Sequence, residues 1–416
     1  MSLFNLVEVD NPLKLADGPM FDGFGRLRAS NAESIFDSKH IRGFLEDTAW
    51  NSSVGSSGTV AINANASTVD LTVPTTNGAF AIWQTREYFN YQAGKSQQIL
   101  MTFVFGAAKA NVTRMAGYYD ANDGVFLQQT TTDIRFVVRS STSGAPVDTN
   151  FAAQSSWNVD KLDGTGASGV TLDLSKSQIL FIDFQWLGVG RVRVGFVING
   201  TAYICHEFYH ANSTVGVYCK NPNLPLRYEI KNTAASASST TLQAICGMVA
   251  SEGGRGLRGL SLSMSMGATT KTLASGTWTP LVCIRGRTGQ VRVPIVPTGF
   301  TAASASTNTC LIGLFILRAG GTHTLTGPSW QTYPVAQSSV ETDIAATALT
   351  PGNATLIKSQ YFSGATKGTG ADLWNLNSLK ACAGIAGTAD IICLAGMGVG
   401  GTALNTIASL DWLEEI

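Results

Sequence analysis

The stretch ILFIDFQWLGVGRVRVGFVINGTAYIC, residues 179–205, decides the fold class of this 416-residue chain. Its residues are largely β-branched and aromatic, and arginine and valine alternate along residues 191–194, as expected for a strand with one buried face. Asn199-Gly200 stands between two apolar runs and is the strongest short signal for a two-residue β-hairpin. We therefore predict that residues 201–208 form the return strand.

The residues that follow, His206-Glu207-Phe208-Tyr209-His210, match the H-E-x-x-H signature of zinc hydrolases. That signature needs a helix, where histidines four residues apart lie on one face and reach a single ion. On a strand the two histidines lie ~13 Å apart, at about 3.3 Å per residue, which is too far to share a zinc ion. We therefore interpret the motif as the end of a hairpin, and we predict no metal, no cofactor and no catalytic residue. A zinc hydrolase is the outlying alternative.

Short β-type runs punctuated by Gly, Asn, Ser and Pro recur along the chain, for example at residues 99–105, 134–139 and 311–317, and helical periodicity is nearly absent. These features predict an all-β protein with two antiparallel, jelly-roll-like β-sandwich domains. The glycine- and arginine-rich stretch 251–259 indicates a linker between the sandwiches. The expected organisation is an extended N-terminal docking arm at 1–45, a first sandwich at 46–255 and a second at 260–416.

The charge composition bears on the partners. Lysine plus arginine equals aspartate plus glutamate at 28 each, and charged residues make up only 13% of the chain. Zero net charge gives no bulk attraction for nucleic acid or an anionic membrane, so we expect neither as a partner. A surface so poor in charge is weakly protected against association. We expect that other subunits cover much of it and that the chain is a homo-oligomer, with a trimer as the expected state. An extracellular β-protein with a Ser/Thr-rich surface is the alternative.

The seven cysteines lie mostly inside apolar runs and form no C-x-x-C pair. Buried free cysteine behaves as a small hydrophobic residue, so we expect unpaired thiols and folding in a reducing cytoplasm. The first residues show no signal-peptide pattern, and no run reaches the roughly 18 consecutive apolar residues of a membrane span.

Two segments are candidate binding sites. The aromatic-rich segment 80–91 contains Trp83, Arg86, Tyr88 and Tyr91, which could form a glycan-binding face; the alternative is a set of core and interface aromatic residues. In the segment 118–124, the side chains of Asp120, Asn122 and Asp123 are oxygen ligands of the kind that Ca²⁺ prefers. Because Asp123-Gly124 is a strong turn signal between apolar residues, we favour a hairpin turn over a calcium site.

Several blocks resemble a family of tailed-bacteriophage virion structural proteins. The segment DGFGRLRASNAESIFDSKH, residues 22–40, is similar to that family's N-terminal signature, although Ala32 stands where a proline is common. The blocks at 183–212 and 221–230 and the ending at 386–416 resemble the same family. The resemblance implies a virion component and carries no catalytic residues over to this chain.

Together these observations predict a non-enzymatic structural protein of a phage particle, made in the host cytoplasm and assembled into the virion as a tail- or baseplate-associated fibre or spike. A capsid-surface decoration or head-fibre protein and a glycan- or receptor-binding module are the alternatives. The partners expected are other virion proteins and a host-surface glycan or receptor. In the docking arm, Arg26, Arg28, Asp37 and Lys39 are the candidate interface charges.

Overall fold

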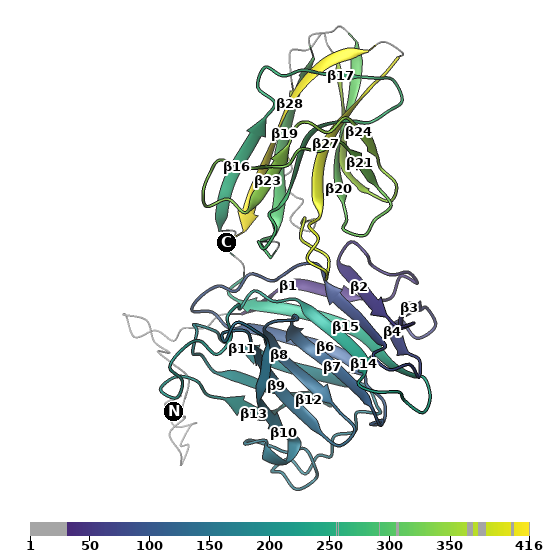
Figure 1. Ribbon diagram of the computed structural model, residues 1–416. Coiled ribbons are helices and arrows are strands. Elements are labelled where there is room, and N and C mark those ends of the chain that lie inside the picture. Colours follow the sequence, from purple (N-terminus) through teal and green to yellow (C-terminus); the bar gives the residue numbers. More distant parts are fainter. Residues whose placement is uncertain are drawn as a thin grey trace, which may run out of the picture.

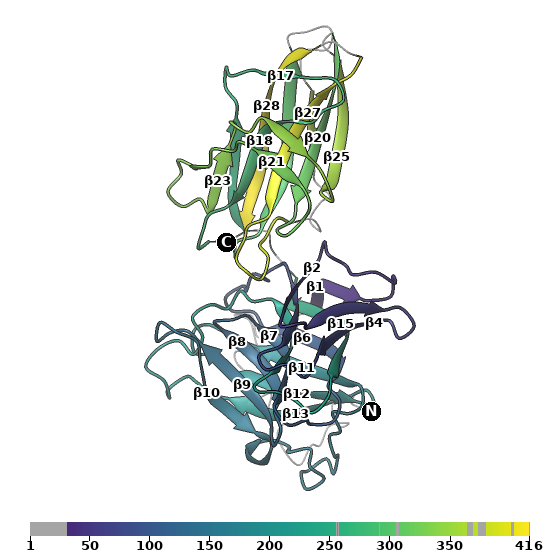
Figure 2. The ribbon, with the colours of Figure 1, turned by 45° about the vertical axis from the view of Figure 1, so that its right-hand side comes forward.

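The structure is a computed structural model that describes residues 31–415, apart from 255, 257, 291, 305–307, 364–368, 373–379 and 401–402. Within these residues the chain forms two antiparallel β-sandwiches, one above the other in Figure 1 and seen from a second side in Figure 2. The one helical element there is the short 3₁₀ turn η2 (Gln154–Ser156), so this part of the chain holds no helix long and apolar enough to cross a membrane. The predicted all-β fold with two sandwiches is confirmed.

The first sandwich packs an eight-stranded sheet against a seven-stranded sheet. The eight-stranded sheet contains β1 (Ala32–Lys39), β3 (Thr59–Asn63), β4 (Thr68–Val73), β6 (Gln97–Val104), β11 (Gln178–Phe184), β12 (Val192–Ile198), β13 (Thr201–Phe208) and β15 (Thr240–Glu252). The seven-stranded sheet contains β2 (Trp50–Gly55), β5 (Phe80–Thr85), β7 (Val112–Tyr119), β8 (Gly124–Gln129), β9 (Ile134–Ser140), β10 (Val147–Ala153) and β14 (Leu226–Asn232).

The hairpin predicted from the opening stretch is confirmed. Strands β12 and β13 pair antiparallel, and Ile198 lies opposite Thr201 across the turn. Asn199 and Gly200 have φ angles of 52° and 80°. Two positive φ angles in succession define the type I′ turn, whose twist matches that of the flanking strands.

Strand β1 corrects the predicted boundary of the docking arm. It pairs with β15 from Ala32 opposite Glu252 to Lys39 opposite Cys246, so residues 32–39 belong to the first sandwich. Phe36 anchors the strand, because its ring lies 5.1 Å from that of Phe89, centroid to centroid. The high local charge of this segment hid a strand whose partner lies more than 200 residues later in the chain.

The core of the first sandwich is built around buried aromatic rings. Trp50 and Trp83 stack with ring centroids 5.6 Å apart and an interplanar angle of 4°, and Tyr228 stacks on Trp50 at 6.0 Å. The indole N–H of Trp50 donates to Ser38 Oγ at 2.9 Å, which ties β1 to the core. Buried aromatic side chains each remove roughly 150–250 Å² from water, so this stack is a large part of the packing energy.

The second sandwich begins with β16 at Gly259, after β15 ends at Glu252. One sheet contains β16 (Gly259–Ser265), β17 (Lys271–Leu273), β19 (Ile295–Ser304), β26 (Thr369–Asp372) and β28 (Leu404–Glu415). The facing sheet contains β18 (Thr279–Gly286), β20 (Thr309–Leu317), β22 (Gln331–Thr332), β23 (Val340–Asp343), β25 (Thr355–Ser363) and β27 (Ile391–Gly398), and a small ribbon pairs β21 (Thr324–Thr326) with β24 (Ala348–Thr350).

One pair of cysteines departs from the expectation of free thiols. Cys283 on β18 lies directly opposite Cys393 on β27, with their Cα atoms 4.2 Å apart, and the two form a disulfide. The sequence separation of 110 residues concealed this pair, which the register of the sheet creates. The remaining cysteines are free, as expected: Cys205, Cys219, Cys246, Cys310 and Cys382.

Candidate functional site

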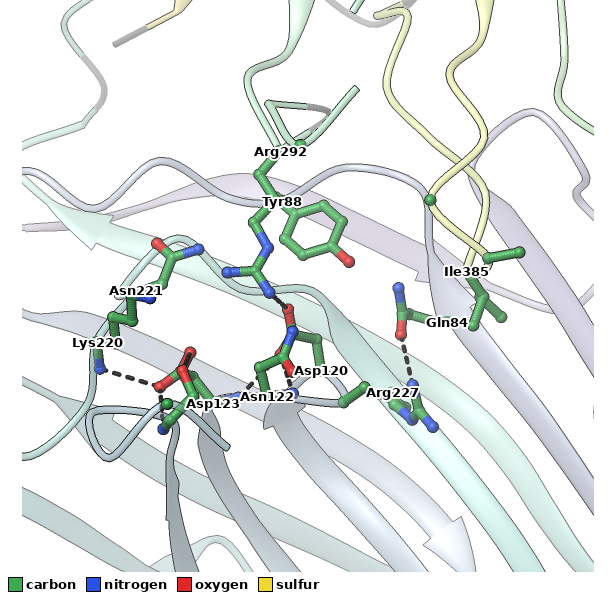
Figure 3. A pocket seen from close by; sticks show the side chains of 16 residues that line it. Gln84, Tyr88, Asp120, Asn122, Asp123, Lys220, Asn221, Arg227, Arg292 and Ile385 are labelled. Atoms are coloured by element: carbon green, nitrogen blue, oxygen red, sulfur yellow. Dashed lines mark hydrogen bonds and ion pairs between the residues drawn. The ribbon is translucent and has the colours of Figure 1, made fainter. Parts of the chain in front are cut away.

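A polar cavity of about 630 Å³ lies where the two sandwiches meet (Figure 3). The first sandwich contributes the segments that contain Gln84, Tyr88, the turn 120–123, Ser141, Gly144, Lys220, Asn221 and Arg227. The second sandwich contributes Gly289 and Arg292, which follow β18, and the turn at residues 385–387. The cavity therefore exists only because loops from both sandwiches close around it. We call it the junction pocket.

The turn between β7 and β8 forms the floor of the junction pocket. Asp120 Oδ1 accepts hydrogen bonds from the backbone N–H groups of Asn122 and Asp123, at 2.7 and 2.9 Å. Asp123 is fully buried, and its carboxylate accepts from the N–H and Oγ of Ser141 and from the N–H of Lys220, at 2.8–3.0 Å. Both carboxylates hold loops in place. The predicted hairpin turn is thus confirmed at this position.

Arg292 reaches across the junction from the second sandwich. Its Nη2 donates to Asp120 Oδ2, and its guanidinium lies 5.6 Å from the centre of the Tyr88 ring. Burial is the main reason that the pKa of Tyr88 is raised to about 12, so its hydroxyl stays protonated at neutral pH. The aromatic ring and the ion pair together form one wall of the junction pocket, as the labelled side chains in Figure 3 show.

A second set of buried charges locks the sandwiches together beside the junction pocket. The carboxylate of Asp390, fully buried, accepts from Arg318 Nη1 at 2.7 Å and from Arg86 Nη1 of the first sandwich at 3.3 Å. Lys380 Nζ lies 2.6 Å from Glu87 Oε1 and 3.3 Å from Glu415. Burial lowers the pKa of Arg86, and the Asp390 carboxylate partly offsets this shift. We call these residues the ionic clamp: Arg86, Glu87, Arg318, Lys380, Asp390 and Glu415.

The structure separates the four residues predicted to form a glycan-binding face. Tyr88 lines the junction pocket and Arg86 belongs to the ionic clamp. Trp83 is fully buried in the stack with Trp50, and Tyr91 is 8% exposed and packs against Phe184. The prediction is therefore wrong for Trp83 and Tyr91, because on β5 and the adjacent loop these rings face the core.

Among the predicted interface charges, Asp37 and Lys39 lie on β1, with their side chains about 60% exposed and paired with each other at 3.0 Å. Arg26 and Arg28 lie outside the described residues. A role for these four residues at an interface stays a prediction.

The H-E-x-x-H segment lies on and just after β13, as predicted. His206 Nδ1 accepts from the backbone N–H of Asn158 at 3.2 Å, whereas His210 Nδ1 lies 2.8 Å from the carbonyl oxygen of Gly190 and its ring stacks on Tyr218. Burial lowers the pKa of both imidazoles. Each histidine thus makes local structural contacts of its own, and among the described residues no group of three potential ligands is placed to hold a metal ion.

Several residues of the junction pocket carry no signal in the sequence. Arg292 and the turn at 385–387 lie in ordinary turns of the second sandwich, and Lys220-Asn221 lies in a loop after β13. Local patterns do not indicate which turns of one domain meet those of another. Two parts of the lining do carry a sequence signal: Tyr88 lies in the aromatic segment 80–91, and the Asp120 segment is a predicted turn.

No family model and no curated protein matches the chain. Solved structures with partial similarity include a carbohydrate esterase from the Shiga toxin-encoding bacteriophage phi24B, at 15% identity and a TM-score of 0.31, covering 53% of this chain and 99% of that one. Lectin I-B4 from Griffonia simplicifolia has 13% identity and a TM-score of 0.31, with coverages of 52% and 99%. Peanut lectin has 11% identity and a TM-score of 0.29, with coverages of 53% and 98%. The overlap with these proteins is weak, and their activities are not transferred by it.

Proposed function

We propose that this chain is a non-enzymatic structural protein of a tailed-bacteriophage particle that binds carbohydrate in the junction pocket. The observation that carries the binding role is the pocket itself, a cavity with mixed donors, acceptors and one aromatic ring. Sugar hydroxyl groups both donate and accept hydrogen bonds, so they suit a wall of amides, ammonium and guanidinium groups. Its volume lies within the range of roughly 300–1,000 Å³ that is typical of small-ligand sites.

The hydrogen bonds of the two carboxylates in the junction pocket, Asp120 and Asp123, support a binding role without catalysis. A general acid or base must be free to exchange a proton with the substrate within hydrogen-bond reach. The oxygens of Asp120 and Asp123 instead accept hydrogen bonds from backbone N–H groups, Ser141 and Arg292. These interactions dedicate both groups to the fold.

A steric block tests the binding role without removing any polar group. Ala386 is exposed at the tip of the turn that lines the junction pocket, so Ala386→Trp fills the cavity. On a glycan array, wild-type protein should retain at least one class of oligosaccharide and Ala386→Trp should lose it. Ala345→Trp, at an exposed position elsewhere on the second sandwich, is the matched control. Equal glycan binding by all three proteins, or none by the wild type, contradicts the proposal.

The virion role is supported by the resemblance of residues 22–40, 183–212 and 221–230 to phage structural proteins. Because β1 begins at Ala32, the arm must be removed without cutting into the sheet. Deletion of residues 1–30 should leave a folded protein that is missing from purified particles, as measured by mass spectrometry. A truncated protein that joins particles at the normal level contradicts docking through this segment. Sedimentation of the wild-type and truncated proteins tests the homo-oligomer, which we expect to be a trimer.

A further inference from the structure

The hydrogen-bonding groups of the junction pocket are unequally engaged. Its two carboxylates, those of Asp120 and Asp123, are occupied by partners within the fold. The carbonyl oxygen of Asn221 likewise accepts the backbone N–H of Asn223 at 3.0 Å, and that of Gln84 accepts from Arg227 at 3.1 Å. These four side-chain acceptors of the lining are therefore used by the protein itself, whereas the exposed amide of Asn122 keeps both an acceptor and donors.

The donors are not used to the same extent. Among the described residues, no group pairs with the ammonium of Lys220, which is an exposed residue of the lining. Arg292 gives one Nη2 hydrogen bond to Asp120, and a guanidinium has further N–H groups to offer. The side-chain amide nitrogen of Asn221 is likewise available, because in the described part of the chain only its side-chain oxygen is engaged.

The charged side chains of the lining also differ in whether they have a partner. Arg227 is neutralised by Glu229 at 2.6 Å, and Arg292 is neutralised by Asp120. Asp123, fully buried, is compensated by three hydrogen bonds. Lys220 therefore remains as the cation of the lining that has no counter-ion in the described part of the chain. Charge-assisted hydrogen bonds from such groups are shorter and roughly twice as strong as neutral ones.

From this excess of donors we propose that the junction pocket selects saccharides that carry an anionic group, held between Lys220 of the first sandwich and Arg292 of the second. This inference rests on the proposed carbohydrate-binding function and specifies its ligand class. The anion is a carboxylate of an acidic sugar or a phosphate ester on a polyol chain, since both present several acceptor oxygens to a donor-rich site. Binding needs both sandwiches, because neither one holds both cations.

The test measures binding of matched ligand pairs to the full-length protein by calorimetry. Sialyllactose is compared with lactose, and an oligomer of glycerol phosphate with glycerol, so that the carboxylate and phosphate sources are distinguished. We expect one acidic member to bind about tenfold or more tightly than its neutral partner. Raising the salt concentration from about 50 to about 300 mM should reduce this preference, because the interaction is partly screened.

The variant Lys220→Gln removes the charge and keeps a polar side chain that is one atom shorter than that of lysine. Because Lys220 is exposed and no described residue pairs with its ammonium, folding should be unchanged, as checked by the melting temperature. The preference for the acidic ligand should fall by about tenfold in this variant. Lys176→Gln, on an exposed lysine outside the junction pocket, is the control.

The outcomes separate the two proposals. Equal binding of acidic and neutral partners, or an unchanged preference in Lys220→Gln, overturns the anionic selectivity while carbohydrate binding stands. A failure of every saccharide on the array to bind overturns the proposed function itself. Loss of the preference in Lys220→Gln but not in Lys176→Gln supports the inference.

Discussion

The ionic clamp gives the sharpest prediction about stability. In Asp390→Asn the two arginines that share this carboxylate, Arg86 and Arg318, lose their common counter-ion. Their side chains are only 6% and 8% exposed, so water replaces the lost charge poorly. The amide that replaces the carboxylate also turns one acceptor into a donor that faces other donors, among them the backbone N–H groups of Ala319 and Cys382.

The size of the effect follows from the burial of these groups. Removing one partner of a buried ion pair costs about 3–5 kcal/mol, because the remaining charge is left without compensation. A domain of this size loses about 2–4 °C of melting temperature per kcal/mol, so the second sandwich should melt roughly 10 °C lower. The contact between the sandwiches should also weaken, since Arg86 belongs to the first sandwich and Asp390 to the second.

The assay is thermal and denaturant unfolding, both followed by tryptophan fluorescence. The rate of proteolytic cleavage at the linker between β15 and β16 is measured on the same proteins. Asp148→Asn is the matched control, because the Arg139–Asp148 pair has a similar distance of 2.7 Å but an aspartate that is 35% exposed. Exposed pairs contribute about 0–1 kcal/mol. If Asp390→Asn loses no more stability than Asp148→Asn and is cut no faster at the linker, the reasoning about the clamp is wrong.

Three further predictions concern single residues of the first sandwich. His40 is buried edge-on against both Trp50 and Trp83, and burial lowers its pKa from 6.5 to about 4. Its contribution to stability is complete above the unfolded-state pKa and is lost as the pH falls from 6.5 towards 4, by about 3 kcal/mol. The free energy of unfolding of wild type should therefore fall more steeply than that of His40→Phe as the pH drops from 6.5 to about 4, and the two should change in parallel above pH 6.5. A parallel pH dependence inside that window refutes the assignment. Gly200→Val places a β-branched residue at a φ of 80° and should lower the free energy of unfolding by about 1–2 kcal/mol, as measured by the denaturant midpoint. An unchanged midpoint contradicts the type I′ turn. Metal analysis of the purified protein should find zinc far below one ion per chain and no change in His206→Ala, and stoichiometric zinc lost in that variant would overturn the strand interpretation of the H-E-x-x-H segment.

The sequence was most informative where a single segment determines its own conformation. The Asn199-Gly200 pair encodes its turn through backbone preference, and the Asp123-Gly124 pair does the same. The orientation of Trp83 was not predictable, because a run such as Phe80 to Thr85 is apolar on both faces. The pairing of β1 with β15 depends on partners far away in the chain.

The junction pocket was beyond prediction for a related reason. Its lining joins Asp120 and Tyr88 of one sandwich to Arg292 of the other, at sequence separations of about 170 to 200 residues. The arrangement follows from the relative placement of the two domains, which depends on the ionic clamp and other side-chain contacts, such as the hydrogen bond from Ile385 N–H to Asn51 Oδ1 at 3.0 Å. Nothing in the local pattern around any one of these residues records the others.

The pairing of β1 with β15 also sets a mechanical property. A pull on the chain before Asn31 is transmitted along β1, where it loads the backbone hydrogen bonds to residues 246–252 in shear, together and not one after another. The force enters the first sandwich through this strand, and it reaches the second sandwich only by way of the first. A particle that held the protein by its N-terminal segment would therefore load the first sandwich before any force reached the second.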